Sequence, residues 1–289
     1  MDQQLNVFVT VVEKQNFSRA AEELHMTQPA VSQYIKNLEQ TLGTKLLERS
    51  NRSVEMNKAG EIVYHHAKEL LNLYSKMHYL LDDLTNRASG ILTIGASYTY
   101  GEYVLPHVIA SIRKAYPLIK LAITIGNSRE IGDLVYSHQL DVGIIEGGYP
   151  ARDMKVQDFT EDEMVIVASP SHLQVEEGRE LEEEMWIVRE SGSGTREATE
   201  KMWAELEVNP SNTMAFGSTQ LIKESVEAGI GISFLSRWTI RKEIELGTLS
   251  ILAIPGFSYK RTFSILMRSP FKTKVLEVFL NEIHDHHTK

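Results

Sequence analysis

The sequence predicts a chain in two parts, a short amino-terminal part rich in helix and a longer α/β domain, joined by a long helix. Three observations carry this prediction. Two amphipathic helical patterns meet at a tight turn within residues 16–46, and an apolar repeat runs through residues 58–87. Strand-like apolar runs then alternate with helical patterns from about residue 90 onward. The expected fold class is therefore α+β in the first part and α/β in the second.

The first helical pair is contained in the stretch NFSRAAEELHMTQPAVSQYIKNLEQTLGTKL. We expect Ser18 to cap the first helix and Thr27 the second, with Pro29 in the first turn of the second helix, where its missing N–H does no harm. Apolar residues recur at helical spacing and should face a core, namely Ala20, Ala21, Leu24, Ala30, Val31, Ile35 and Leu38. The residues left facing outward on the second helix are Gln28, Ser32, Gln33 and Lys36.

These outward residues have the chemistry that a DNA major groove requires. Gln and Ser in the first turns of a helix can hydrogen-bond to base edges, and Lys can contact phosphate. Residues 46–55 then indicate two short strands around a polar tip, which would place Arg49 and Arg52 on the sugar–phosphate backbone. The pattern predicts a winged helix-turn-helix, with an ordinary amphipathic helical hairpin as the alternative.

Over about sixty residues, this order of elements closely resembles the amino-terminal domain of LysR-type transcriptional regulators. The matching residues are Phe17, Ser18, Arg19, Ala20, Ala21, Leu24, Gln28, Pro29, Ala30, Val31, Ser32, Ile35, Leu38, Glu39, Leu42, Gly43, Leu46, Arg49, Ala59 and Gly60. Leu47 stands where the family usually has Phe, and Asn57 where it usually has Thr. Leu47 is still an apolar residue that can fill a core position, and Asn57 can still cap a helix.

The resemblance implies a DNA-binding domain over residues 1–57, which would bind double-stranded promoter DNA and act with RNA polymerase. The residues implied to read bases are Gln28, Pro29, Ser32 and Gln33. Those implied to contact phosphate are Ser18, Arg19, Thr27, Lys36, Arg49 and Arg52. The target genes stay open, as does the choice between activator and repressor.

The formal net charge of −9 argues against a protein that simply coats nucleic acid. Residues 1–90 carry 10 Lys and Arg against 11 Asp and Glu, a balance of −1, so the remaining −8 lies in the longer part. With no cysteine, disulfides and thiol chemistry are excluded, including the thiol sensing that the peroxide-responsive LysR-type proteins use. No secretory signal is visible and no apolar run reaches the roughly 20 residues of a membrane span, so we expect a cytoplasmic protein with no membrane partner.

Residues 58–88 are predicted to form one linker helix with a coiled-coil seam. Apolar residues recur at alternating steps of four and three at Val63, Ala67, Leu70, Tyr74, Met77, Leu81 and Leu84. The alternative is a long helix that packs on its own domain. In LysR-type proteins this helix pairs subunits, so the resemblance implies a homodimer or homotetramer that holds two recognition helices apart.

The remaining sequence predicts an α/β domain with largely parallel sheets. Strands are expected at residues 91–95, 121–125, 142–145, 164–168, 186–188, 232–235, 250–254 and 263–267, and helices at 105–115, 130–137, 195–206 and 220–228. This part resembles the LysR effector-binding domain, which is built like a two-lobed periplasmic binding protein. The implied domain covers residues 89–289, with lobe I at about 91–160 and 255–289 and lobe II at about 165–250.

Hydroxyl-bearing residues follow several of the expected strands, where ligands of such sheets bind. The SGSGTR stretch at residues 191–196 opens a helix and offers N–H groups, hydroxyls and a guanidinium to an anion; a flexible turn is the alternative. It looks most like the regulators of sulphur assimilation and carbon fixation, which respond to small anions. The effector-binding residues that we expect are Ser97, Thr99, Asn127, Glu146, Ser193, Thr195, Arg196 and Ser218.

Glu146 departs from a simple anion site, because a carboxylate disfavours an anion unless it pairs with Arg196 or with an ammonium group of the ligand. An amino acid is therefore an open alternative to a sulphur anion, a phosphorylated metabolite or a carboxylate. The charge run at residues 161–163 is expected to be a solvated hinge. The histidines show no metal-ligand spacing, and no catalytic constellation or cofactor motif appears.

The sequence thus favours a transcriptional regulator, rather than an enzyme, that is controlled by a small molecule, in the first place a small anion, bound in the cleft between two α/β lobes. The rival hypothesis is a solute-binding or enzymatic α/β domain with an incidental helical amino terminus. That rival predicts no sequence-specific DNA binding.

Overall fold

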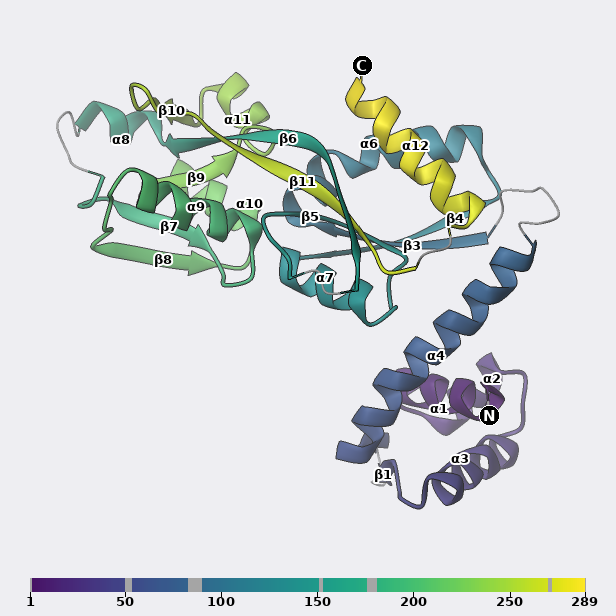
Figure 1. Cartoon of the computed structure of the whole chain (residues 1–289). Helices are drawn as coiled ribbons and strands as arrows, with labels where there is room; N and C mark the ends of the chain where they lie inside the picture. Colours follow the sequence, from purple (N-terminus) through teal and green to yellow (C-terminus); the bar gives the residue numbers. More distant parts are fainter. Residues whose placement is uncertain are drawn as a thin grey trace. The chain divides into compact units, whose positions relative to one another are not determined.

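The computed structural model describes residues 2–49, 54–82, 90–150, 153–175, 181–269 and 272–288. The chain forms two compact units, Met1–Leu84 and Thr85–Lys289 (Figure 1). None of the described helices is both long enough and apolar enough to cross a membrane.

The first unit contains a helical core, a two-stranded wing and a long helix. Its elements in order are α1 (Asp2–Lys14), α2 (Phe17–Glu23), α3 (Gln28–Leu42), β1 (Leu47–Arg49), β2 (Val54–Met56) and α4 (Lys58–Asp82). Of the apolar positions expected to point inward on α3, Val31, Ile35 and Leu38 are buried in one core with Phe8 of α1, whereas Ala30 is half-buried. The helix-turn-helix and the wing are therefore both present.

The cap of α2 differs from the prediction. Asn16 is the capping residue, and its Oδ1 accepts the backbone N–H groups of Ser18 at 2.9 Å and Arg19 at 3.0 Å. Ser18 lies inside the helix with an exposed side chain. The reason is that Asn caps as well as Ser, so the helix begins two residues earlier than a Ser18 cap would allow and includes Phe17 and Ser18. Thr27 caps α3 as expected, accepting the N–H of Ala30 at 3.4 Å.

The wing is fixed to α3 by a side chain of that helix. Glu39 Oε1 accepts the backbone N–H of Leu46 at 2.8 Å and that of Leu47 at 3.4 Å. Gly60 of α4 packs directly on the same segment, where a Cβ would lie 2.2 Å from the Leu46 carbonyl oxygen. Asn57 caps α4 by accepting the N–H of Gly60 at 2.9 Å, as predicted for this position.

Within the described residues, the second unit has one seven-stranded sheet of order β10-β6-β11-β5-β3-β4, with β9 paired to β6. These strands are β3 (Gly90–Ser97), β4 (Ile119–Gly126), β5 (Val142–Glu146), β6 (Lys155–Ala168), β9 (Ser233–Ser236), β10 (Ser250–Leu252) and β11 (Tyr259–Met267). A second sheet pairs β7 (Met185–Arg189) with β8 (Asn212–Phe216). Strands β3, β4 and β5 are parallel, as are β7 and β8, whereas the pairs made by β6 and β11 are antiparallel. The expectation of largely parallel sheets therefore holds for only part of the unit.

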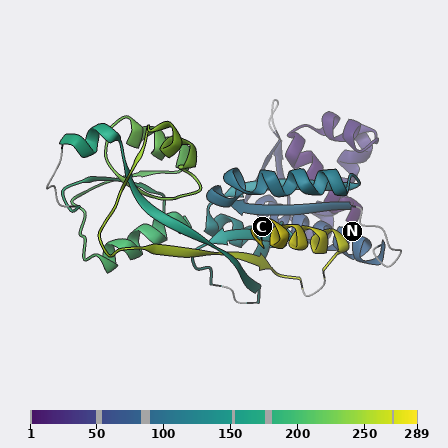
Figure 2. The ribbon, with the colours of Figure 1, turned by 90° about the horizontal axis from the view of Figure 1, so that it is seen from above.

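Two long strands connect the two lobes of this unit. Strands β6 and β11 are paired from Tyr259 with Met164 to Met267 with Lys155, and the ribbon runs from one lobe into the other (Figure 2). Both strands begin before the apolar runs predicted at 164–168 and 263–267. Their first halves are rich in charged and polar residues, so they carry no continuous apolar pattern.

Helices cover both lobes. They are α5 (Tyr98–Tyr103), α6 (Leu105–Ala115), α7 (Ser128–Tyr136), α8 (Pro170–Val175), α9 (Gly194–Glu205), α10 (Thr219–Glu227), α11 (Arg241–Leu246) and α12 (Lys274–Thr288). Lobe I has a core around Tyr100, Phe263 and Phe279. Lobe II has a separate core around Trp186 and Phe234. The four helices predicted in this region are all found.

Candidate DNA-reading face and effector site

The outward face of α3 presents its polar side chains to solvent. Gln28, Pro29, Gln33 and Lys36 are exposed, and Ser32 is half-buried. Gln28 Nε2 donates to Ser32 Oγ at 3.0 Å, and Gln33 Nε2 donates to Asn37 Oδ1 at 2.7 Å. Such exposed i,i+4 bonds are weak, so these amides can exchange them for base edges without leaving a buried group unpaired.

Several exposed cations lie on the same unit. Arg19, Lys36 and Lys45 are exposed, and none of them forms an ion pair within the described part of the chain. The side chain of Arg49 and all of Arg52 lie outside the described residues. Unpaired surface cations around a helix that carries amides fit a surface that binds the phosphate backbone.

The seam predicted on α4 divides into two parts. Ala67 is buried and Val63 is half-buried, because both pack on the core of their own unit. The contact with α1 is reinforced at Glu13, which accepts from Lys68 Nζ at 2.9 Å and Tyr64 Oη at 3.1 Å. These first two seam positions are therefore corrected to intradomain packing.

The later seam positions are exposed. The exposed fractions are 54% for Leu70, 48% for Tyr74, 46% for Met77 and 56% for Leu81, and Leu84 lies outside the described residues. Four large apolar side chains at heptad spacing form a solvent-facing stripe, which is the feature that a partner helix would cover.

In the second unit, the carboxyl ends of β3 and β5 bring three predicted effector residues together. Ser97, Thr99 and Glu146 are all buried, and Thr99 Oγ1 donates to Glu146 Oε1 at 3.2 Å. Ser97 Oγ and Glu146 Oε2 make no hydrogen bond with any described residue. A buried polar atom without a partner is costly, so these two atoms mark a place where a ligand or water can bind.

The residue that organises this site is Arg261 on β11, which the sequence analysis missed. Its Nε donates to Asp162 Oδ2 at 2.8 Å, its Nη1 to Thr195 Oγ1 at 2.9 Å and its Nη2 to Thr99 Oγ1 at 3.1 Å. Glu146 Oε1 lies 3.5 Å from the same guanidinium. One buried cation on β11 thus joins α5, β5, β6 and α9.

We call Thr99, Glu146, Asp162, Thr195 and Arg261 the inter-lobe cluster. Its two carboxylates face one guanidinium, so its charge is negative when both are ionised. Burial raises the pKa of Asp162 above the ordinary value, even though Arg261 beside it works in the opposite direction. Asp162 is 1% exposed, so the prediction of a solvated hinge at residues 161–163 is wrong for its central residue.

A second buried arginine lies at the end of β7. Arg189 Nε donates to Glu190 Oε2 at 2.7 Å, and its Nη1 donates to Thr219 Oγ1 at 3.1 Å. Its guanidinium carbon lies 4.5 Å from the centre of the Tyr98 ring. Asn127, a predicted effector residue, donates from Nδ2 to Glu190 Oε1 at 3.3 Å. Burial would raise the pKa of Glu190, but the hydrogen bonds from Arg189 hold it below the ordinary value.

The SGSGTR stretch does not supply its arginine to the site. Arg196 Nε donates to Glu200 Oε1 at 2.6 Å, one turn further along α9. Because successive residues of a helix diverge by about 100°, Thr195 and Arg196 cannot face the same way. The prediction of Arg196 as an anion ligand is therefore wrong.

The hydroxyls that remain have structural partners. Ser193 caps α9 by accepting the N–H of Thr195 at 3.2 Å, and Ser218 caps α10 by accepting that of Leu221 at 3.4 Å. A Cβ on Gly194 would lie 2.2 Å from the carbonyl oxygen of Glu146, so the amino terminus of α9 packs directly on the end of β5. The two lobes are in direct contact at this edge.

Comparison with known proteins agrees with this architecture. Residues 3–61 match the family model described as "Bacterial regulatory helix-turn-helix protein, lysR family", and residues 85–288 match the "LysR substrate binding domain". The chain is 38% identical over 284 residues to the HTH-type transcriptional regulator CysL of Bacillus subtilis, which covers 96% of this chain and 94% of that protein. It is 32% identical over 289 residues to the HTH-type transcriptional activator CmpR of Synechocystis, with coverage of 98% and 94%.

Solved structures share the fold over the whole chain. Full-length OxyR of Pseudomonas aeruginosa has a TM-score of 0.72 at 24% identity, covering 98% of this chain and 94% of that one. CbnR, solved with its target DNA, has a TM-score of 0.73 at 18% identity and covers 99% of each chain. With both family models matched and a regulator of 38% identity over nearly the full length, the chain belongs to the LysR family of DNA-binding transcriptional regulators.

Proposed function

We propose that this regulator binds a dyad-symmetric promoter site as a homo-oligomer. We propose further that a small molecule bound between the lobes of the second unit changes its affinity for DNA. The observation that supports DNA reading most strongly is the α3 face, where Gln28, Gln33 and Lys36 are exposed and Ser32 is half-buried on a capped helix. Gln28, Ser32 and Gln33 would read base edges, with Pro29 packing beside them.

Phosphate contacts would come from residues around α3. Arg19 and Lys36 are exposed cations, Ser18 is an exposed hydroxyl, and Arg49 and Arg52 belong to the wing segment. The hydroxyl of Thr27 already caps α3. A phosphate near Thr27 would therefore interact mainly with the amino terminus of α3 rather than with this hydroxyl. Because its relative CmpR is a transcriptional activator, we propose activation, through contact with RNA polymerase, as the direction of control. Because its target would be the chromosome, the regulator should act in the cytoplasm.

Pairing of subunits would cover the exposed stripe of α4. Leu70, Tyr74, Met77 and Leu81 lie on one side of that helix and are each about half exposed. A second copy of the same helix offers a matching stripe, which would bury these side chains and set the distance between two recognition helices.

The charge of the inter-lobe cluster favours a zwitterion over a bare anion as the effector. Arg261 already pairs with two carboxylates, and Arg189 pairs with Glu190. An added anion would have to compete with these carboxylates, whereas an ammonium group would bind the unpartnered Glu146 Oε2, and Ser97 Oγ would hydrogen-bond to the rest of the ligand. We therefore propose an amino acid or a close derivative, and we retain a small anion as the second candidate.

The mechanism would be a population shift. The effector would bind one arrangement of the two lobes more tightly than another, and a difference of about 1–3 kcal/mol is enough for detectable control. The ribbon of β6 and β11 carries Asp162 and Arg261, so a change in the cluster acts directly on the strands that connect the lobes.

Fluorescence anisotropy with the DNA upstream of the protein's own gene tests this proposal, with a scrambled duplex as the control. We expect selective binding that amino acids such as serine shift, and that sulfate, thiosulfate and phosphate do not. Glu146→Gln should abolish the shift but keep DNA binding. Selective binding that responds to sulfate instead would support the anion. No selectivity at any salt concentration would favour the rival solute-binding or enzymatic domain.

A further inference from the structure

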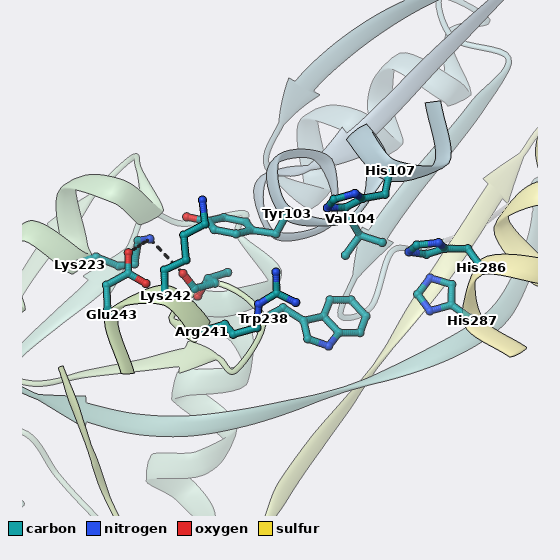
Figure 3. Close-up of a pocket in the computed structure, with 11 residues that line it drawn as sticks. Tyr103, Val104, His107, Lys223, Trp238, Arg241, Lys242, Glu243, His286 and His287 are labelled. Atoms are coloured by element: carbon teal, nitrogen blue, oxygen red, sulfur yellow. Dashed lines mark hydrogen bonds and ion pairs between the residues drawn. The ribbon is translucent and has the colours of Figure 1, made fainter. Parts of the chain in front are cut away.

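A pocket of the second unit lies apart from the inter-lobe cluster. It has a volume of about 430 Å3 and is lined by α5, α6 and α12 of lobe I and by α10, α11 and the turn after β9 of lobe II. None of the residues that line it belongs to the expected effector set. Figure 3 shows its residues, with the Lys223–Glu243 pair on one side, histidines on the other, and Arg241 and Trp238 between them. We call it the α11–α12 pocket.

The balance of charge in this pocket is positive. Lys223 Nζ lies 2.5 Å from Glu243 Oε1 and donates to the Thr239 carbonyl oxygen at 3.0 Å, so these two charges cancel. Arg241 and Lys242 are exposed and make no ion pair within the described part of the chain. Two cations at the first turn of α11 are therefore available to an anionic ligand.

Imidazoles form the opposite side of the pocket. The rings of His107 and His286 are parallel, with centroids 6.3 Å apart, and His287 Nε2 lies 3.1 Å from Tyr100 Oη. Burial and the neighbouring His286 lower the pKa of His287. A bound anion would have the opposite effect, because an added negative charge favours the imidazolium form.

The pocket also has an apolar surface and a free acceptor. Val104 is buried and Trp238 is half-buried, and both line the cavity. Glu243 Oε2 is buried and makes no hydrogen bond with any described residue, so it can accept from a ligand hydroxyl. From this combination we infer that the α11–α12 pocket binds a small hydroxylated organic dianion, either a phosphomonoester or a dicarboxylate.

Such a ligand would act on both lobes. Its anionic group would be held by α11 of lobe II and by the histidines of α6 and α12 of lobe I, so binding would restrain their relative movement. Binding itself stands apart from the proposed function, but its effect on DNA affinity rests on that function, because it would act through the same lobe arrangement. The regulator would then sense two kinds of small molecule.

Titration of the full-length protein with glycerol 3-phosphate and with malate, at constant ionic strength, tests the inference. Trp238 lines the pocket while Trp186 and Trp203 lie in the core of lobe II, so tryptophan fluorescence should report binding. Trp238→Phe should remove most of the fluorescence change but keep the heat of binding measured by calorimetry. The probe that binds more tightly identifies the phosphomonoester or the dicarboxylate as the ligand class.

The variant Arg241→Ala/Lys242→Ala should weaken binding about tenfold or more, because it removes two charged contacts. A matched control exists in Arg113→Ala/Lys114→Ala, which removes the same pair of charges from the exposed end of α6, outside the pocket. The control should bind as the parent does. Equal weakening in both variants would mean general charge attraction and would overturn the inference, provided that both variants unfold at the parent's temperature.

Malate binding should tighten from about pH 8 to about pH 6, because a bound dianion favours the imidazolium form of His287. The ionisable groups that face these rings are Tyr100 and Tyr103 of α5, Lys223 of α10, and Arg241, Lys242 and Glu243 of α11. Absence of saturable binding of both probes at the lower pH would overturn the inference. Failure of the proposed function would appear differently, as a lack of DNA selectivity in the anisotropy assay.

Discussion

The α3 face and the inter-lobe cluster place similar polar residues in opposite environments, one exposed to solvent and the other buried. On α3, polar side chains lie exposed on one helix and bond only to neighbours four residues away. In the inter-lobe cluster, polar side chains are buried and come from distant segments, with Arg261 and Thr99 separated by 162 residues. An exposed face can read an external partner at small cost to stability. A buried cluster instead makes the arrangement of the lobes depend on a few charges.

Removal of the central cation should produce the largest effect. Arg261→Met leaves Asp162 and Glu146 buried without their counter-charge, so we expect a loss of about 3–5 kcal/mol in the free energy of unfolding. Arg196→Ala, which removes a partly exposed pair with Glu200, should cost at most about 1 kcal/mol. Urea unfolding of both variants measures the difference. Equal losses would contradict the central place given to Arg261.

The next largest loss of stability should come from a substitution where the two lobes are packed closely together. Gly194→Ala would place a Cβ 2.2 Å from the Glu146 carbonyl oxygen, so the contact must open at a cost of about 1–3 kcal/mol. Gly217→Ala is a matched control, because its Cβ would meet nothing within 4 Å. Thermal unfolding should separate the two variants. If Gly194→Ala were as stable as Gly217→Ala, the lobes would not be held together at this point.

On the α3 face, stability should hardly change while recognition does. Gln33→Ala should cost about 1–3 kcal/mol of discrimination between the specific site and a site changed at one base pair. Lys36→Ala should weaken binding to all sequences and reduce the salt slope by about one, since it removes a phosphate contact. Anisotropy titrations over a range of salt concentrations measure both quantities. Equal losses on specific and random DNA for both variants would refute the division of roles.

A smaller effect is expected from His287 and depends on pH. The pKa of His287 is lowered in the folded chain, so the folded state resists protonation of this residue and stability falls as pH decreases below the ordinary histidine value of about 6.5. His287→Gln should therefore flatten the loss of stability in that range. Urea midpoints between about pH 5 and about pH 8 test this. If the stability of His287→Gln changed with pH as the parent's does, a group other than His287 would be responsible for the loss of stability at low pH.

The same comparison explains which features could be predicted from sequence. The residues of α3 follow a helical period within one short segment, so their orientation is fixed locally and the prediction succeeded. Thr99, Glu146 and Thr195 were found because they follow strand ends, where the topology of α/β sheets gathers polar groups. Helix geometry turned Arg196 away, a detail that the motif alone did not reveal.

Arg261 was missed because its partners are assembled only by the tertiary fold. One local indication did exist, since Arg261, Phe263 and Ile265 alternate along β11 and all three are buried. A charged residue at an inward position of a strand implies a buried partner. Strand β8 was missed for a related reason, because its residues are mostly exposed and form no apolar run.

The most direct test of the central claim, that this chain reads DNA sequence through α3, is selection of bound fragments from a random DNA pool. We expect the full-length parent to enrich one dyad-symmetric motif whose half-sites are spaced by about one helical turn or a multiple of it. Gln33→Ala should lose part of that motif at a defined base position. Enrichment of no motif by the parent, or of an identical motif by Gln33→Ala, would contradict the assignment of the reading face.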